Sequence, residues 1–437
     1  MNWFFLAGIV IVVLGLMVSI GLHEVGHLVP AKIFGVRVTQ YMVGFGSTMF
    51  SIRRGETEYG IKWIPFGGYI RMIGMLPPRP GDDPTKLRRA STGPFQGLID
   101  TARDVAQEEV RPGDEDRVFY RKKWWQKVII MSGGPAMNFV LSFVLFAIVL
   151  MGFGVLTNKP TVSAMSQCVI PYSQVQTDPN RKCTPADQVT PAVKAGMKAG
   201  DQIVSFNGVR VASWDALVEK IRANGAGQVS LGIVRDGAPQ TLKVDLIAQD
   251  RPKVDDMKTI EEGVGFLGVM PTQVIEKKDF GFVVVHMGDL TGRVFQSLIN
   301  LPEKMVGVWN AAFSGDERDP NGPVGVVGVG RIGGEIAASD APTENKFVAL
   351  LTLLAGFNLA IGMFNLIPLL PLDGGHIAGG LWEGLKRAFA RVMRRPEPGY
   401  VDIAKVLPLT YALALVMIVM AGLLVYADLV NPIKLSG

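Results

Sequence analysis

The sequence predicts a polytopic α-helical membrane protein with four transmembrane helices, a membrane-associated β-sheet and one small α+β domain outside the membrane. Only 19% of the 437 residues are charged, whereas soluble domains average about 25%. Four stretches long enough to cross a bilayer contain no charged residue at all. Two regions between these stretches instead show the apolar alternation and turn residues that are typical of strands. These three observations favour membrane helices combined with two regions of sheet.

The composition also excludes several function classes. The 44 Lys and Arg residues exceed the 39 Asp and Glu residues by five, a surplus too small and too dispersed for nucleic-acid binding. Two cysteines cannot build a disulfide scaffold or a multi-cysteine metal cluster. The chain has four histidines, so the positions of these few metal-binding side chains are informative.

The stretches without charge place the four helices. They cover residues 1–22, 128–158, 347–372 and 406–427. The transmembrane helices are therefore predicted over residues 1–34, 127–158, 346–378 and 406–428. No Lys or Arg precedes the first apolar run, which favours a retained helix over a cleaved secretory signal.

The connecting segments predict the orientation. Residues 35–127 carry 16 basic and 11 acidic side chains, and residues 374–405 carry 6 basic and 3 acidic side chains. The long segment 159–346 carries 20 basic and 22 acidic side chains. Short basic loops stay in the cytoplasm, while long domains are exported largely regardless of charge. We therefore expect a cytoplasmic loop over 379–405, an exported middle segment, and both termini outside, the last as a tail over 429–437.

The two cysteines agree with this orientation. Cys168 and Cys183 both lie in the segment predicted to be exported, where a disulfide can form and persist. Two unpaired thiols are the alternative. We expect a bridge, because two cysteines alone in one exported segment usually pair.

The segment after the first helix predicts strands. Residues 35–76 alternate apolar and polar side chains around Gly44-Phe45-Gly46, which indicates several short strands of a sheet that dips into the membrane. Residues 77–126 are then a cytoplasmic insertion, polar and broken by Pro and Gly up to about residue 118. Trp124 and Trp125 follow a run of cations, as in an interfacial anchor.

The exported segment contains one recognisable module, over residues 159–250. Asn207-Gly208 and Asp236-Gly237 each lie between apolar runs and predict tight hairpins, and Ser213 can cap a helix between them. This order of elements resembles a PDZ domain of the bacterial, circularly permuted kind. Such domains bind an extended or C-terminal peptide as an added strand.

Residues 251–345 predict an extracytoplasmic linker, amphipathic in one part and glycine-rich in another. Residues 280–313 have helical periodicity and favour a helix lying on the bilayer. The run from Asn321 to Gly330 is interrupted by glycine too often for a helix and is expected to form a loop near the site. His286 could pack or bind a ligand, and packing is the more frequent role of a lone histidine in an apolar stretch.

The chemistry is predicted at the inner end of the first helix. His23-Glu24-Val25-Gly26-His27 has the H-E-x-x-H spacing, which puts both imidazoles on one helix face, where they can bind one Zn²⁺. Glu24 lies beside them and can take a proton from water. A helix end with incidental histidines is the alternative, but such polar groups are expensive to place in a membrane without a partner.

The third ligand is expected from the third helix. Asp373 is the sole acid between Glu344 and Glu383. The prolines at 368 and 371 break the helix just before it and could turn it toward the metal. The first and third helices run in the same direction, so Asp373 and the two histidines reach a similar depth. An ordinary Pro-Gly loop is the alternative, and His376 is a rival ligand.

With these motifs the chain resembles the site-2 protease family, most of all bacterial intramembrane zinc proteases of the regulator-of-sigma-E type. The resemblance rests on HEVGH, NLIPLLPLDGG and the PDZ-like module, and covers essentially the whole chain. It implies that His23, His27 and Asp373 bind zinc and that Glu24 is catalytic. It also implies substrate-binding roles for Asn365, Asn138 and Gly44-Phe45-Gly46. Enterobacterial relatives carry two PDZ domains, whereas one is recognisable here.

The resemblance also implies the reaction and the partners. The expected protein is a multi-pass enzyme of the bacterial inner membrane that cleaves transmembrane segments of pre-trimmed single-span proteins, such as anti-sigma factors. Zinc activates a water molecule, and Glu24 accepts its proton and passes it to the leaving amine. Two other classes stay open. A PDZ-bearing adaptor with structural zinc would normally show four protein ligands, and a zinc transporter would normally show internal repeats.

Overall fold

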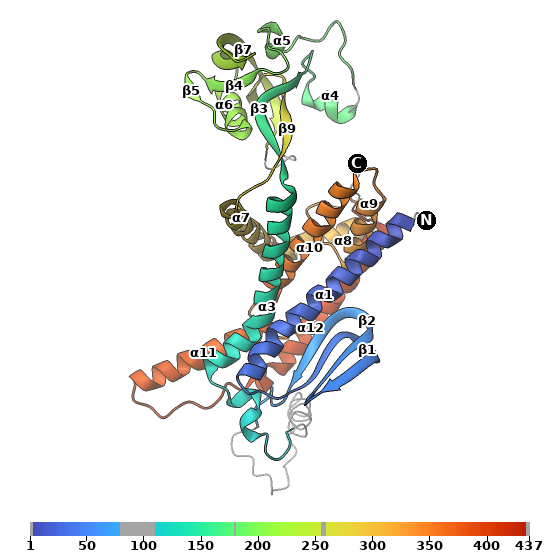
Figure 1. Cartoon of the computed structure of the whole chain (residues 1–437), viewed down its shortest axis with the longest axis vertical. Coiled ribbons are helices and arrows are strands. Elements are labelled where there is room, and N and C mark those ends of the chain that lie inside the picture. Colours follow the sequence, from blue (N-terminus) through green and yellow to red (C-terminus); the bar gives the residue numbers. More distant parts are fainter. Residues whose placement is uncertain (1–2, 79–109, 179–180, 255–258, 434–437) are drawn as a thin grey trace. The chain divides into compact units, whose positions relative to one another are not determined.

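The computed structural model describes residues 3–78, 110–178, 181–254 and 259–433. The chain forms two compact units: a helical unit, Met1–Gly152 with Asp279–Gly437, and a sheet unit, Phe153–Lys278. Most of the predicted insertion, residues 79–109, lies outside the described residues. Figure 1 labels the elements of both units.

Four described helices are long and apolar enough to cross a membrane. They are α1 (Trp3–Ile33), α3 (Trp124–Ala147) continued by η3 (Ile148–Phe153), α10 (Thr343–Asn365), and η4 (Ile403–Val406) continued by α12 (Leu407–Val430). This confirms the four predicted apolar helices.

The third of these helices is shorter than predicted. The prolines at 368 and 371 follow the end of α10 at Asn365, because proline lacks the N–H that a helix interior needs. A separate helix, α11, then begins at Asp373 and runs to Val392. Asp373 is therefore the first residue of a new helix and not the end of a span. The range 379–405, expected as a loop, is helical as far as Val392.

Helix α1 packs against α3 and against α9 (Val326–Ala338). A glycine-rich loop was predicted from Asn321 to Gly330. This prediction is wrong from Val326 on, where α9 begins. A Cβ atom on Gly333 would collide with Val12 of α1, and one on Gly8 would collide with the backbone of Gly333. The glycines serve close helix–helix packing, as small residues do in membrane helices.

The sheet beside α1 has two long strands, β1 (Val38–Arg54) and β2 (Thr57–Met72), where several short ones were expected. Both strands bend sharply, so the first part of β1 pairs with both ends of β2: Met42 faces Gly60 on one side and Tyr69 on the other. The bend of β1 falls at Gly44 and Gly46, which have φ of +93° and +84°. The curled sheet thus behaves as four short strands.

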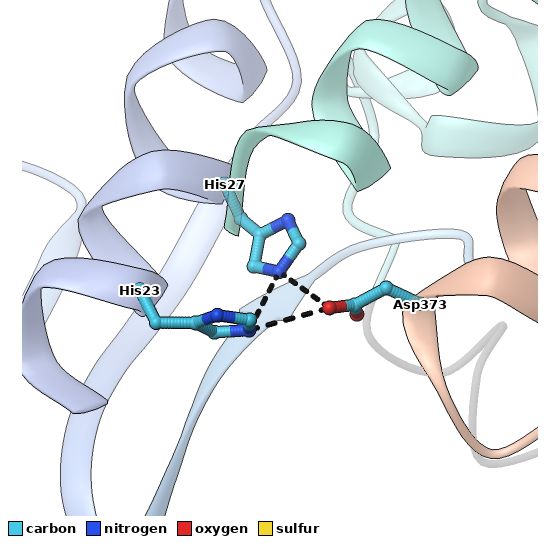
Figure 2. A group of neighbouring side chains, drawn as sticks. All are labelled: His23, His27 and Asp373. Atoms are coloured by element: carbon cyan, nitrogen blue, oxygen red, sulfur yellow. Dashed lines mark hydrogen bonds and ion pairs between the residues drawn. The ribbon is translucent and has the colours of Figure 1, made fainter. Parts of the chain in front are cut away.

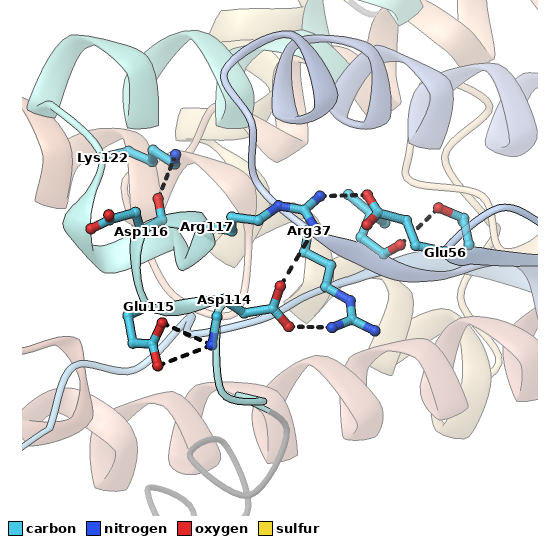
Figure 3. A network of polar contacts seen from close by, with 10 residues as sticks. Arg37, Glu56, Asp114, Glu115, Asp116, Arg117 and Lys122 are labelled. Carbon is cyan, nitrogen blue, oxygen red and sulfur yellow. Dashed lines mark hydrogen bonds and ion pairs between the residues drawn. The ribbon is translucent and has the colours of Figure 1, made fainter.

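Two sets of polar contacts hold this sheet in place. The Tyr41 hydroxyl donates to the carbonyl of Gly21 on α1, 2.8 Å away. At the other end, Asp114 accepts hydrogen bonds from Arg37, the residue just before β1, and from Arg117, whose Nη2 lies 2.7 Å from Glu56 in the β1–β2 turn (Figure 3). This network joins the sheet to the segment that leads into α3 through η1 (Glu115–Arg117) and η2 (Phe119–Arg121).

The sheet unit has the strand order β8-β7-β6-β4-β3-β9, with β5 paired to β4. Both predicted hairpins are confirmed, since Asn207 and Asp236 have φ of 49° and 52° in the β4–β5 and β6–β7 turns. Ser213 caps α6, as predicted, by accepting from the N–H of Ala216 at 3.2 Å. The strands are β3 (Val155–Met165), β4 (Gln202–Phe206), β5 (Val209–Arg210), β6 (Gly227–Arg235), β7 (Ala238–Pro252), β8 (Ile260–Phe266) and β9 (Val269–Glu276), and the helices α4 (Tyr172–Thr177), α5 (Pro191–Lys194) and α6 (Trp214–Asn224).

The sheet unit is longer than the predicted module. Strands β8 and β9 lie beyond residue 250, where a linker was expected, and they pair with β7 and β3. The structure also joins Cys168 and Cys183 of this unit in a disulfide.

The remainder of the predicted linker forms two helices of the helical unit before α9, namely α7 (Phe280–Ile299) and α8 (Leu301–Phe313). His286 of α7 lies against two aromatic rings. The centroids of Phe146 and Phe282 are 5.5 Å and 5.9 Å from that of its imidazole. These contacts agree with the expected packing role.

Candidate metal centre

Three possible metal ligands converge in the helical unit. Two imidazoles of α1, His23 and His27, meet the carboxylate of Asp373 at the start of α11 (Figure 2). The Nε2 atoms of the histidines are 3.3 Å apart, and each lies 3.2 Å from Oδ2 of Asp373. The three atoms thus form a nearly equilateral triangle.

This triangle fits a zinc ion. Tetrahedral zinc with bonds of about 2.0–2.1 Å separates its ligand atoms by about 3.3 Å. Two neutral imidazoles and a carboxylate are among the donors that zinc prefers. Among the described residues no fourth His, Cys, Asp or Glu belongs to the group. Three protein ligands leave one position open, as in catalytic zinc sites and unlike closed structural ones.

Neighbouring groups orient these ligands. Nδ1 of His27 lies 2.8 Å from the carbonyl of Ile130 on α3 and donates to it, so that Nε2 carries the free lone pair. Asp373 supplies the anionic donor of the set, since a carboxylate that binds a metal is deprotonated.

A close helix crossing makes room for the site. A Cβ atom on Gly133 of α3 would collide with the carbonyl of Gly26 on α1. One on Gly134 would collide with Nε2 of His27 and lie 2.6 Å from Nε2 of His23. Only glycine leaves these positions open, so α3 forms one wall of the metal site with bare backbone. The sequence reasoning missed this wall, and the signal that could have indicated it is the Gly-Gly pair within an apolar helix.

Glu24 lies beside the triangle but outside it. Its carboxylate accepts a hydrogen bond from the backbone N–H of Ile70 on β2. A Cβ atom on Gly68 would be 3.1 Å from Cγ of Glu24, so strand β2 runs directly past this side chain. The carboxylate is thus held near the ligands without occupying a ligand position.

A cavity of about 390 Å³ opens beside His23 and Glu24. Asn138, Asn365 and Asp373 also line it, so the two predicted substrate-binding asparagines lie on its wall. Asn138 is 1% exposed, and both polar atoms of its amide lack a hydrogen-bond partner among the described residues. Buried amides are normally paired, so this one is available to a ligand.

The predicted Gly44-Phe45-Gly46 turn is not on the wall of this cavity. Its place is taken by Pro65, Gly67 and Gly68 of β2. The ring of Phe45 packs over Gly67 and so lies one layer away from the cavity. The sheet that contains this turn therefore reaches the cavity through β2, and the substrate-binding role of Gly44-Phe45-Gly46 stays a prediction.

The rival ligand, His376, does not join the group of three converging residues. It lies one turn after Asp373 on α11, and burial lowers the pKa of its imidazole to about 4. The imidazole is therefore neutral, and its Nδ1 atom has no partner among the described side chains and backbone groups.

Comparison with known proteins agrees with this geometry. The sequence profile of Peptidase family M50 matches residues 11–395. The chain is 32% identical to the zinc metalloprotease Rip1 of Mycobacterium tuberculosis over 99% of both proteins. It is 25% identical to the regulator of sigma-W protease RasP of Bacillus subtilis, over 81% of this chain and 85% of RasP. It is 24% identical to the metalloprotease MmpA of Caulobacter vibrioides, over 88% of both.

Proposed function

This chain belongs to Peptidase family M50, the site-2 zinc metalloproteases of membranes, and from this premise we propose that it cleaves transmembrane segments of single-span proteins at the His23, His27 and Asp373 centre. The observation that carries the proposal is the three-ligand centre with an open position, next to Glu24 and a cavity. A structural zinc site would be closed by a fourth protein ligand.

The residues of the chain have distinct tasks in this reaction. His23, His27 and Asp373 hold the zinc ion, which when bound polarises the peptide carbonyl and acidifies the attacking water. Glu24 accepts the proton of that water and delivers it to the leaving amine. The hydrogen bond from Ile70 keeps the Glu24 carboxylate turned toward the cavity.

The sheet edge supports the substrate. A transmembrane helix satisfies all of its backbone hydrogen bonds internally, so its peptide bonds are protected until a stretch unwinds. Strand β2 brings Pro65, Gly67 and Gly68 to the cavity. Backbone groups there can pair with an unwound segment as an added strand. The amide of Asn138, which has no partner among the described residues, can bind further backbone groups of the unwound substrate segment. The amide of Asn365 on the same cavity wall can do the same.

A comparison of two substrates that differ in the position of a glycine pair tests this proposal. The full chain in liposomes should cleave a single-span substrate up to about thirtyfold faster when two central leucines are replaced by glycine, because two glycines cost a helix about 2 kcal/mol. The same pair at the end of the segment is the matched control. Cleavage of both substrates is followed by mass spectrometry. Equal rates for the two substrates would show that unwinding is not required.

The orientation follows from the charge of the connecting segments. The two basic segments face the cytoplasm, and the sheet unit and both termini lie outside the inner membrane of a bacterial cell. The Cys168–Cys183 disulfide supports an oxidising location for the sheet unit.

Cysteine labelling in whole cells tests this orientation. On a background with Cys168→Ser and Cys183→Ser, a membrane-impermeant maleimide should modify Lys243→Cys of the sheet unit. It should modify Glu115→Cys only after the cells are lysed. Both positions are exposed in the structure. The reverse pattern would overturn the proposed orientation.

The sheet unit is a PDZ domain that meets the external part of the substrate. Its groove of about 880 Å³ between α6 and β8 supports binding of an extended or C-terminal peptide. The substrates are membrane-spanning proteins already trimmed outside the cell, such as anti-sigma factors. The name of RasP, a regulator of sigma-W protease, supports this class of substrate.

A further inference from the structure

Helix α11 has an exposed apolar face that neither the fold nor the metal centre uses. The exposed fraction of each residue is between 51% and 59% for Leu381, Trp382, Leu385 and Phe389, and it is 81% for Val392. Their spacing of three and four residues puts them on one side of the helix. The opposite side is buried against α3: Glu383 is 1% exposed and lies 2.7 Å from Nζ of Lys127. α11 is not among the candidate spans, so its apolar face needs another partner.

The basic side chains beside this face indicate the charge of that partner. Residues 381–397 contain five Lys or Arg and two Glu. Glu383 and Glu397 are both paired with Arg387. The described residues offer no hydrogen-bond or ion-pair partner to the four remaining cations, which are Lys386, Arg391, Arg394 and Arg395. Arg391 projects from another side of the helix, and the other three leave the surface next to the apolar face positive.

An apolar groove lies between the helix and the chain that follows it. Its volume is about 460 Å³, and Trp382, Leu385 and Phe389 form one side of it. Pro396 and Pro398 form the other side, while Lys386 and Arg395 also line the groove. Apolar walls combined with two cations suit a hydrocarbon chain that carries an anionic headgroup.

The depth of α11 is set by its contacts with α3. A Cβ atom on Gly384 would lie 2.7 Å from the indole of Trp124, the first residue of α3. Tryptophans at the end of a span mark the level of the lipid headgroups. α11 passes this level and extends away from the bundle, at the end opposite to the two termini (Figure 1). An amphipathic helix with a basic flank at this level is typical of an interfacial helix.

We propose that α11 lies in the headgroup region of the bilayer and that the groove of Trp382, Leu385 and Phe389 binds an anionic phospholipid through Lys386 and Arg395. Because Asp373 is the first residue of this helix, the lipid also steadies the third ligand of the metal centre. The proposal depends on membrane embedding and does not depend on the cleavage reaction.

The test measures where α11 lies in the membrane. The full chain, with both native cysteines replaced by serine, carries a fluorophore at Leu385→Cys or, as the matched control, at Arg391→Cys on another side of the same helix. It is reconstituted in phosphatidylcholine vesicles with or without about 30 mol% phosphatidylglycerol. Shallow nitroxide lipids should quench position 385 several times more than position 391, and aqueous iodide should show the reverse. Equal access of iodide to both positions would overturn the proposal.

The second arm tests the anionic headgroup. Each cation near an anionic surface is worth about a fivefold change in lipid binding. The double variant Lys386→Gln with Arg395→Gln should therefore lose most of the extra lipid quenching that phosphatidylglycerol produces at position 385. Lys386→Arg with Arg395→Lys should retain it, and so should the control Arg210→Gln with Lys243→Gln in the sheet unit. Far-ultraviolet circular dichroism verifies that each variant is folded.

Two outcomes of this arm would overturn the proposal. One is an unchanged response of the Lys386→Gln and Arg395→Gln variant to phosphatidylglycerol. The other is protection of position 385 from iodide only after a cytosolic extract is added, since the face would then belong to a protein partner and not to lipid.

Discussion

Glu24→Gln should abolish proteolysis and leave zinc content unchanged. The amide has nearly the shape of the carboxylate but cannot accept the proton of the attacking water, and general acid–base groups contribute about 10²–10⁴-fold to such reactions. Glu24 lies outside the triangle of ligand atoms, so its replacement spares the metal. The measurement combines the cleavage rate of a single-span substrate in liposomes with zinc determined on the same sample.

Asp373→Ala is the matched comparison, because it should lose both zinc and activity. It removes the sole carboxylate of the triangle, whose Oδ2 lies 3.2 Å from each imidazole. Full zinc in Asp373→Ala would contradict the ligand assignment. Loss of zinc in Glu24→Gln would mean that the glutamate binds the metal and is not the base.

Gly134→Ala should expel the metal from an otherwise folded protein. The added methyl group would collide with Nε2 of His27 and lie 2.6 Å from Nε2 of His23. Ligand atoms must stay within about 0.2 Å of their proper distances. We therefore expect zinc to fall from about one ion per chain to roughly a tenth of that or less, and activity to fall with it. Zinc measured on purified protein gives the result.

Gly356→Ala is the control for this prediction. Gly356 also lies within an apolar helix, α10, but nothing stands within 4 Å of a Cβ atom there. Zinc and activity should both stay at the level of the unchanged protein. If Gly134→Ala keeps its zinc, then α3 can move away from α1, and the crossing does not define the metal site.

The shared helix face of His23 and His27 and the four spans could be predicted from the sequence because their signals are local. The i, i+4 spacing puts His23 and His27 on one face of any helix. A stretch without charge that is as long as a bilayer is thick predicts a span wherever it occurs. The hairpins at Asn207-Gly208 and Asp236-Gly237 were equally predictable, since their turn geometry depends on the residues of the turn itself.

Other features depend on contacts between distant segments, and only the tertiary structure decided them. The glycines at the start of α9 suggested a loop because glycine weakens an isolated helix. Close packing stabilises this helix in the fold, with Gly328 against Asp428 of α12 and Gly333 against Gly8 and Val12 of α1. The prolines before Asp373 predicted a break but not the helix that follows it, which is held by the pairing of Lys127 with Glu383.

The residues that line the cavity were likewise decided only by the tertiary structure. Which segment of the curled sheet faces Glu24 depends on how β1 folds back along β2, and the sequence pattern is the same for either choice. The role of Gly134 depends on α1 and α3 crossing at that residue. Periodicity and turn chemistry describe a segment by itself, whereas a helix crossing is set by the shapes of two surfaces that meet only in the folded protein.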